Sequence, residues 1–179
     1  RYFDNDTAPT RGWGIATELG VGTTLRPERD PFVRTFARWL YFQPLGKVTA
    51  PDGSSRRARI ALRTEAGAVL ARAGAQIPVT QLFLTGGDTT VRGYSLRSIG
   101  ARTENDQLFG GRYLAVASAE WQRPIIVGGT VSDFESALFV DVGAVGDRVA
   151  DLHARVGVGA GLRWRSPVGP LQTDLAYGV

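Results

Sequence analysis

The amino-acid sequence predicts an all-β protein whose strands cross a lipid bilayer, and three features carry this prediction. Apolar and polar side chains alternate with period two over stretches of about ten residues, as in a transmembrane strand with one lipid-facing side. Clusters of glycine, proline and aspartate separate these stretches and are typical of turns. Aromatic residues lie near the ends of several stretches, where a barrel wall meets the membrane interface; they are Trp13, Trp39, Tyr41, Trp121, Trp164 and Tyr177.

The clearest predicted strand runs from Arg155 to Arg165. Every residue on one of its faces is arginine or glycine, and every residue on the other face, from Val156 to Trp164, is apolar. The first face is too charged for the core of a soluble protein, and the second is too continuous to face water. We therefore expect lipid against the apolar face and the barrel interior against the other.

Six further stretches are expected to be strands with the same two faces. In chain order they are residues 13–22, 32–44 (the least regular), 57–70, 113–122, 137–144 and 171–177. Their alternation places Glu120 on an inward face, and likewise Phe139, Asp141 and Gly143. A soluble β-sandwich or a lipocalin-like barrel is the alternative, and the charged inward faces argue against it.

The connections between these strands are of two kinds. Residues 9–12 and 166–170 contain the proline and glycine of tight turns. Residues 72–111 and 125–135 break the alternation and are expected to be longer connections; the first far exceeds a hairpin and is expected to be functional or disordered. About seven strands cannot close an even-numbered bacterial barrel, so we expect residues 1–179 to be an excised piece of a larger one.

Composition excludes several other classes of protein. The chain has 179 residues, a net charge of +4 and no cysteine, so neither a disulfide framework nor a thiolate metal site is expected. Its arginines are spread along the predicted strands rather than gathered in one run, which argues against nucleic-acid binding. No apolar run reaches the roughly 18 residues of a membrane-spanning helix.

The long connection carries the most specific candidate site. Within residues 84–94, glycines flank a single arginine in the order Val91, Arg92, Gly93, Tyr94. An arginine inside a barrel requires a carboxylate partner, and the next two predicted strands supply inward-facing acids. We therefore predict that Arg92 folds into the lumen and pairs with Asp141 and Glu120. The alternative is a solvated arginine in a flexible loop.

The residues that an enzyme would use are sparse. The single histidine, His153, lies in a predicted turn with Asp147 and Asp151, without a partnered serine. Gly86 and Gly87 lack the lysine and the following helix of a phosphate-binding loop. We expect no catalytic residue, no cofactor and no metal.

Four motifs resemble the outer-membrane-protein assembly factor superfamily, which includes BamA, TamA and the two-partner secretion transporters. Asp4-Asn5 with residues 9–13 resembles a periplasmic turn, and Val91-Arg92-Gly93-Tyr94 resembles the signature of the sixth extracellular loop. Residues 139–143 match an inward-facing Phe-x-Asp-x-Gly strand motif. Residues 163–170, with Asp174, match the penultimate strands. The motifs span nearly the whole chain. Residues 83–88, leading into the Arg-Gly-Tyr form, look closest to TamA.

This resemblance implies a bacterial outer-membrane barrel of sixteen antiparallel strands, preceded by periplasmic POTRA domains. Residues 1–179 would be its C-terminal part, from the tail of strand eight to strand fifteen, without the POTRA domains, the first half of the barrel or the last strand. Residues 72–111 would be a loop folded into the lumen.

The function implied is that of a non-enzymatic insertase or translocase, which assists the assembly of outer-membrane proteins, autotransporters in particular, through a lateral seam. Its partners would be the outer-membrane bilayer, unfolded outer-membrane protein clients and a periplasm-spanning inner-membrane protein, and no nucleic acid. A passive outer-membrane channel, or a translocator of a secreted or tethered passenger, is the alternative.

Overall fold

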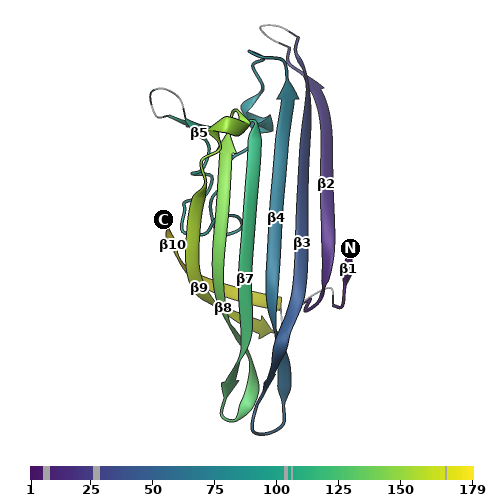
Figure 1. The fold of residues 1–179 in the computed structure, drawn as a ribbon, viewed down its shortest axis with the longest axis vertical. Coiled ribbons are helices and arrows are strands. Elements are labelled where there is room, and N and C mark those ends of the chain that lie inside the picture. The colour runs from purple at the N-terminus through teal and green to yellow at the C-terminus, as the bar shows by residue number, and fades with distance from the viewer. Residues whose placement is uncertain (6–8, 26–28, 103–104, 106, 168) are drawn as a thin grey trace.

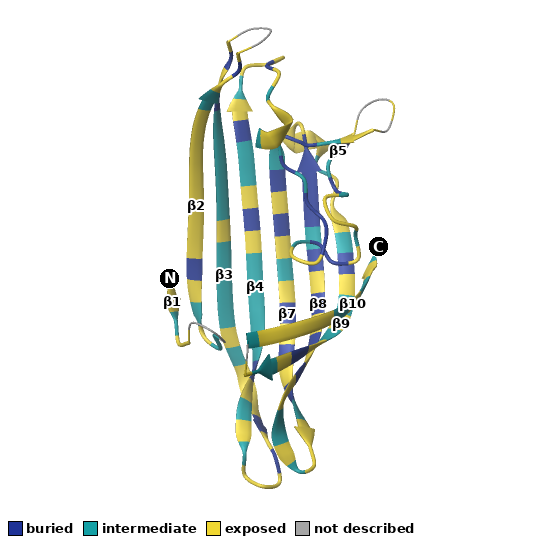
Figure 2. Ribbon diagram, turned by 180° about the vertical axis from the view of Figure 1, so that it is seen from behind, coloured by how far each residue is buried: buried dark blue, intermediate teal, exposed yellow. Residues whose placement is uncertain are grey.

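A computed structural model describes residues 1–5, 9–25, 29–102, 105, 107–167 and 169–179. Within these ranges, eight strands form one antiparallel sheet in the order β1-β2-β3-β4-β7-β8-β9-β10 (Figure 1). The strands are β1 (Tyr2–Phe3), β2 (Gly12–Thr23), β3 (Pro31–Thr49), β4 (Ser55–Ala71), β7 (Tyr113–Val127), β8 (Thr130–Gly146), β9 (Arg155–Ser166) and β10 (Gly169–Gly178). The sheet is curved, and β9 and β10 turn across its concave side (Figure 2).

The all-β prediction is confirmed, and the seven predicted strands correspond to β2, β3, β4, β7, β8, β9 and β10. The predicted lipid-facing side is the exposed side: Leu138 and Leu175 are 53% and 83% exposed, whereas the inward-facing Asp141 is fully buried. Buried residues gather on the concave side of β7 and β8, under the connection that follows β4 (Figure 2). The turn predicted at residues 166–170 includes Val168, which lies outside the described residues.

The prediction that residues 125–135 form a long connection is wrong. Strands β7 and β8 continue through it and meet at Gly128 and Gly129, whose φ angles of 60° and 83° suit glycine in a tight turn. The alternation is lost there because the β7–β8 register shifts between Pro124 and Ile126. At this bulge Ile125 of β7 lies opposite residues 132–134 of β8, so β8 carries two extra residues, which interrupt the period-two pattern without ending the hairpin.

Two hairpins project beyond the shared sheet at the end opposite the long connection (Figure 1). The pairing of β4 with β7 ends at Arg59 and Gln122, while β3–β4 and β7–β8 continue as separate hairpins. Their tips are joined, because the Val131 N–H donates to Ser54 Oγ at 2.9 Å and the Asp52 N–H donates to the Gly129 carbonyl at 3.2 Å. The two hairpins therefore form one projecting unit.

The connection between β4 and β7 folds back onto the concave side of the sheet. It contains the short helix η1 (Val79–Gln81) and the two-stranded ribbon of β5 (Ala101–Arg102) and β6 (Leu108–Phe109). The apolar core lies between this connection and the wall; its buried members are Phe32, Val69, Phe83, Val91, Ile99, Leu114, Val116 and Val145. In the described part of the chain, no helix is long and apolar enough to cross a membrane.

Candidate functional site: the docked loop arginine

Small residues on the inner wall let the loop approach closely. A Cβ atom on Gly143 of β8 would lie 2.5 Å from Val91 Cγ2, and one on Gly157 of β9 would lie 1.8 Å from the Arg92 carbonyl oxygen. Both distances are too short for any side chain to fit without moving the loop. On the glycine-rich face predicted for β9, Gly157 is therefore the point where the loop backbone contacts the strand, whereas a Cβ on Gly159 would meet the Phe139 ring at 2.4 Å.

Asp141 holds Arg92 with both of its carboxylate oxygens. Arg92 Nε and Nη2 donate to Asp141 Oδ2 and Oδ1 at 2.7 and 2.9 Å, and the Arg92 backbone N–H donates to Oδ2 at 3.1 Å. Ser118 Oγ donates to Oδ1 at 2.6 Å. A fork of two parallel charge-assisted bonds fixes the orientation of the guanidinium as well as its position.

Glu120 of β7 and Asp174 of β10 occupy the other side of the same guanidinium. Arg92 Nη1 donates to Glu120 Oε2 at 2.6 Å and to Asp174 Oδ2 at 3.2 Å. Arg163 of β9 closes a ring, since its Nη2 donates to the same two oxygens at 2.8 and 3.2 Å. The two guanidinium groups thus contact three carboxylates and share two of them, Glu120 and Asp174, a pairing that buried charges require.

The remaining residues of the predicted motif also contact the wall. The guanidinium carbon of Arg92 lies 3.4 Å from the centre of the Phe139 ring, within the range of a cation–π contact. Gly93 has a φ of 90°, and a Cβ on it would lie 2.5 Å from the Tyr177 carbonyl carbon. The Tyr94 hydroxyl donates to the Val179 carbonyl at 2.8 Å. The structure thus brings together Val91–Tyr94, Glu120, Phe139, Asp141 and Gly143.

Arginines of the wall hold the loop at further points that the sequence analysis missed. Arg34 Nε donates to the Gln81 carbonyl at 3.2 Å, and its guanidinium lies over the Phe83 ring at 4.5 Å. Arg63 Nη2 donates to the Thr90 carbonyl at 2.7 Å, and Arg112 Nη2 donates to the Ala75 carbonyl at 2.8 Å. The available signal was an arginine on the inward face of a predicted strand, as the alternation places Arg63.

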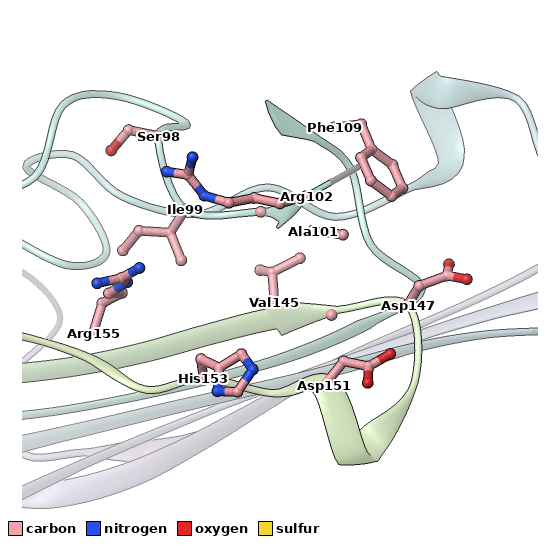
Figure 3. Close-up of a pocket in the computed structure, with 12 residues that line it drawn as sticks. Ser98, Ile99, Ala101, Arg102, Phe109, Val145, Asp147, Asp151, His153 and Arg155 are labelled. Atoms are coloured by element: carbon pink, nitrogen blue, oxygen red, sulfur yellow. The ribbon is translucent and has the colours of Figure 1, made fainter. Parts of the chain in front are cut away.

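A cavity of about 310 Å³ lies beside the docked loop, between β5 and the β8–β9 turn (Figure 3). Ile99 and Val145 line it, together with His153 and Asp151. Ser98 lies across the cavity from His153 (Figure 3), so these residues form no nucleophile–base pair. Among the described residues, no group of three or more histidine, aspartate or glutamate side chains could hold a metal ion.

A curved antiparallel sheet with an apolar outer face and a charged inner face, carrying a loop docked by a buried arginine, defines the wall of a transmembrane β-barrel. The model of the Omp85 superfamily domain matches residues 2–179. The chain belongs to this superfamily, and its location is the bacterial outer membrane.

Curated relatives are similar over nearly the whole chain. The outer membrane protein assembly factor BamA of Neorickettsia risticii is 30% identical over 97% of the chain, and that of Nitratidesulfovibrio vulgaris is 34% identical over 98%. The chain spans 23% and 21% of the lengths of these relatives.

A solved structure shares the fold. The crystal structure of BamA from Haemophilus ducreyi lacking POTRA domains 1–3 superposes with a TM-score of 0.71 at 20% identity. It is covered over 37% of its length by the whole of this chain.

Proposed function

We propose that this chain is the C-terminal wall of a sixteen-stranded, non-enzymatic barrel that inserts or translocates outer-membrane proteins. One observation carries the proposal: Arg92 is held by acids from β7, β8 and β10, so the loop ties three strands of the wall into one unit. Similarity to BamA proteins supports the same conclusion.

The mechanism follows from the hydrogen-bonding demands of a strand in lipid. An unpaired backbone group in hydrocarbon costs several kcal/mol, so an incoming client strand gains by pairing with an exposed edge at a seam. If the wall deformed when the client strand paired, part of this favourable free energy of pairing would be lost. The role we assign to Val91–Tyr94, with Glu120, Phe139, Asp141 and Gly143, is to stiffen the wall against which the seam opens.

Autotransporters are the clients that we favour, with a periplasm-spanning inner-membrane protein as partner. The support is the resemblance of residues 83–88 and of the Arg-Gly-Tyr form to TamA. A passive channel is disfavoured, because the inward arginines that would line it donate instead to carbonyl groups of the loop.

The test is complementation with the full-length protein. Cells depleted of the native copy receive the wild type, Arg92→Ala, Asp141→Ala or the exchanged pair Arg92→Asp with Asp141→Arg. We expect both single variants to lower the amounts of folded outer-membrane protein and of surface-exposed autotransporter passenger, and the exchange to restore part of the loss. Normal assembly in the single variants, together with a large steady conductance in planar bilayers, would favour a channel instead.

A further inference from the structure

We infer that Asp174 and Arg163 are positioning residues, which transmit the docked state of the loop to strand β10. Their effect on client assembly rests on the proposed function, but the coupling between loop and strand does not. The inference starts from the fact that Asp174 Oδ2 accepts hydrogen bonds from two guanidinium groups, Arg92 of the loop and Arg163 of β9, at 3.2 Å each.

The backbone under this contact is shaped to accept it. Gly161 of β9 lies directly across from Asp174 in the sheet register. A Cβ on Gly161 would lie 1.9 Å from Asp174 Oδ1 and 2.7 Å from Arg163 Nη1, so any larger residue would displace the pair. The Asp174 carboxylate therefore occupies the space above Gly161 and reaches Arg92 of the loop.

A second contact joins the loop to β10 near the end of the strand. The Tyr94 hydroxyl donates to the Val179 carbonyl, and Gly93 packs on the backbone of Tyr177 and Gly178. The loop thus touches β10 at two levels, Asp174 and residues 177–179. In the described part of the sheet, β10 has one hydrogen-bonded neighbour, β9, so these contacts add a constraint from the lumen side.

The loop does not depend on β10 to stay docked. Asp141 and Glu120 contact the Arg92 guanidinium from β8 and β7, whose pairing is long and continuous. Loss of the Asp174 carboxylate therefore leaves two of the three acids in place. The expected consequence is a displaced β10 beneath a loop that remains docked.

The experiment is distance measurement by pulsed electron resonance on the full-length protein in lipid nanodiscs. Spin labels are placed on cysteines at Leu96 of the loop and at Leu175 of β10, both highly exposed. A second label pair, at Leu96 and Leu138 of β8, reports docking itself. We expect Asp174→Asn to broaden the 96–175 distribution and move it to longer distances, while the 96–138 distribution stays unchanged.

Several variants separate coupling from general damage. Tyr94→Phe removes one hydroxyl and is expected to broaden the 96–175 distribution in the same direction, whereas Asp174→Glu keeps a carboxylate and is expected to restore it. Asp133→Asn is the matched control, because this acid pairs with Arg56 in the projecting hairpins. An unchanged 96–175 distribution in both Asp174→Asn and Tyr94→Phe, or equal broadening of both label pairs, would overturn the inference.

Client assembly is measured on the same variants. Reduced assembly of outer-membrane proteins together with a displaced β10 supports both the coupling and its role. A displaced β10 with normal assembly supports the coupling and contradicts the proposed function.

Discussion

The substitution Asp141→Asn tests how strongly the wall holds the loop. The side chain keeps its volume but loses the charge that faces Arg92, in a site with no solvent exposure. Removing one partner of a buried ion pair costs about 3–5 kcal/mol. The low end applies here, because Glu120 and Asp174 remain within 2.6 and 3.2 Å of the same guanidinium.

A loss of about 3 kcal/mol corresponds to roughly a hundredfold change in the equilibrium for loop opening, at about 1.4 kcal/mol per factor of ten. Hydrogen exchange measures this opening at the amides of Thr85 and Ile99, which bond to each other's carbonyls at 2.9 Å across the loop. We expect these amides to exchange about two orders of magnitude faster in Asp141→Asn in a bilayer.

The control is Asp147→Asn, because Asp147 is about half exposed and pairs with Arg112 at 3.4 Å. Exposed pairs contribute about 0–1 kcal/mol, so exchange should change less than tenfold. Exchange rates in Asp141→Asn equal to those of the wild type would show that the Asp141 pair does not hold the loop.

Three further predictions concern other contacts. Gly157→Val places a side chain where the Arg92 carbonyl lies and should undock the loop, seen as new protease cleavage within residues 84–99; an intact loop would contradict the close contact of the loop backbone with Gly157. Arg63→Ala removes the donor to the Thr90 carbonyl and should speed hydrogen exchange at residues 86–90 by about tenfold, with Thr85 less affected. The pKa of Asp4 is lowered to about 2, because the Thr10 hydroxyl and the Arg11 N–H donate to its carboxylate. The stability this contributes is present above the ordinary pKa of 3.8 and is lost as pH falls through 2; carbon-13 NMR titration of Asp4 with a midpoint near 3.8 would refute it.

The alternation of apolar and polar residues predicted most of the strands of the fold. A period-two pattern fixes which side of a strand faces lipid, so the inward orientation of Glu120 and Asp141 could be inferred before any coordinates were known. The tip of the β7–β8 hairpin escaped prediction because, at the irregularity beside Pro124, one residue of β7, Ile125, lies opposite three residues of β8, 132–134. The bulge interrupts the sequence pattern, but β7 and β8 remain hydrogen-bonded on both sides of it.

The wall arginines and Asp174 were harder to assign. Arg34, Arg63 and Arg112 donate to backbone carbonyls, which every residue carries, so no sequence pattern marks the acceptors. Asp174 was visible as an inward acid of the last predicted strand. Its contact with Arg92 depends on how far the sheet curls, and curvature has no local signature.

The docked arginine also bears on the order in which the wall is built. Arg92 precedes its three acids by 28, 49 and 82 residues, so each acid is made after the group it must meet. A slip of one residue turns an acid to the opposite face, and a slip of two moves it by about 7 Å, beyond hydrogen-bonding reach. Contact of Arg92 with all three acids at once therefore requires β7, β8 and β10 to be paired in their native alignment.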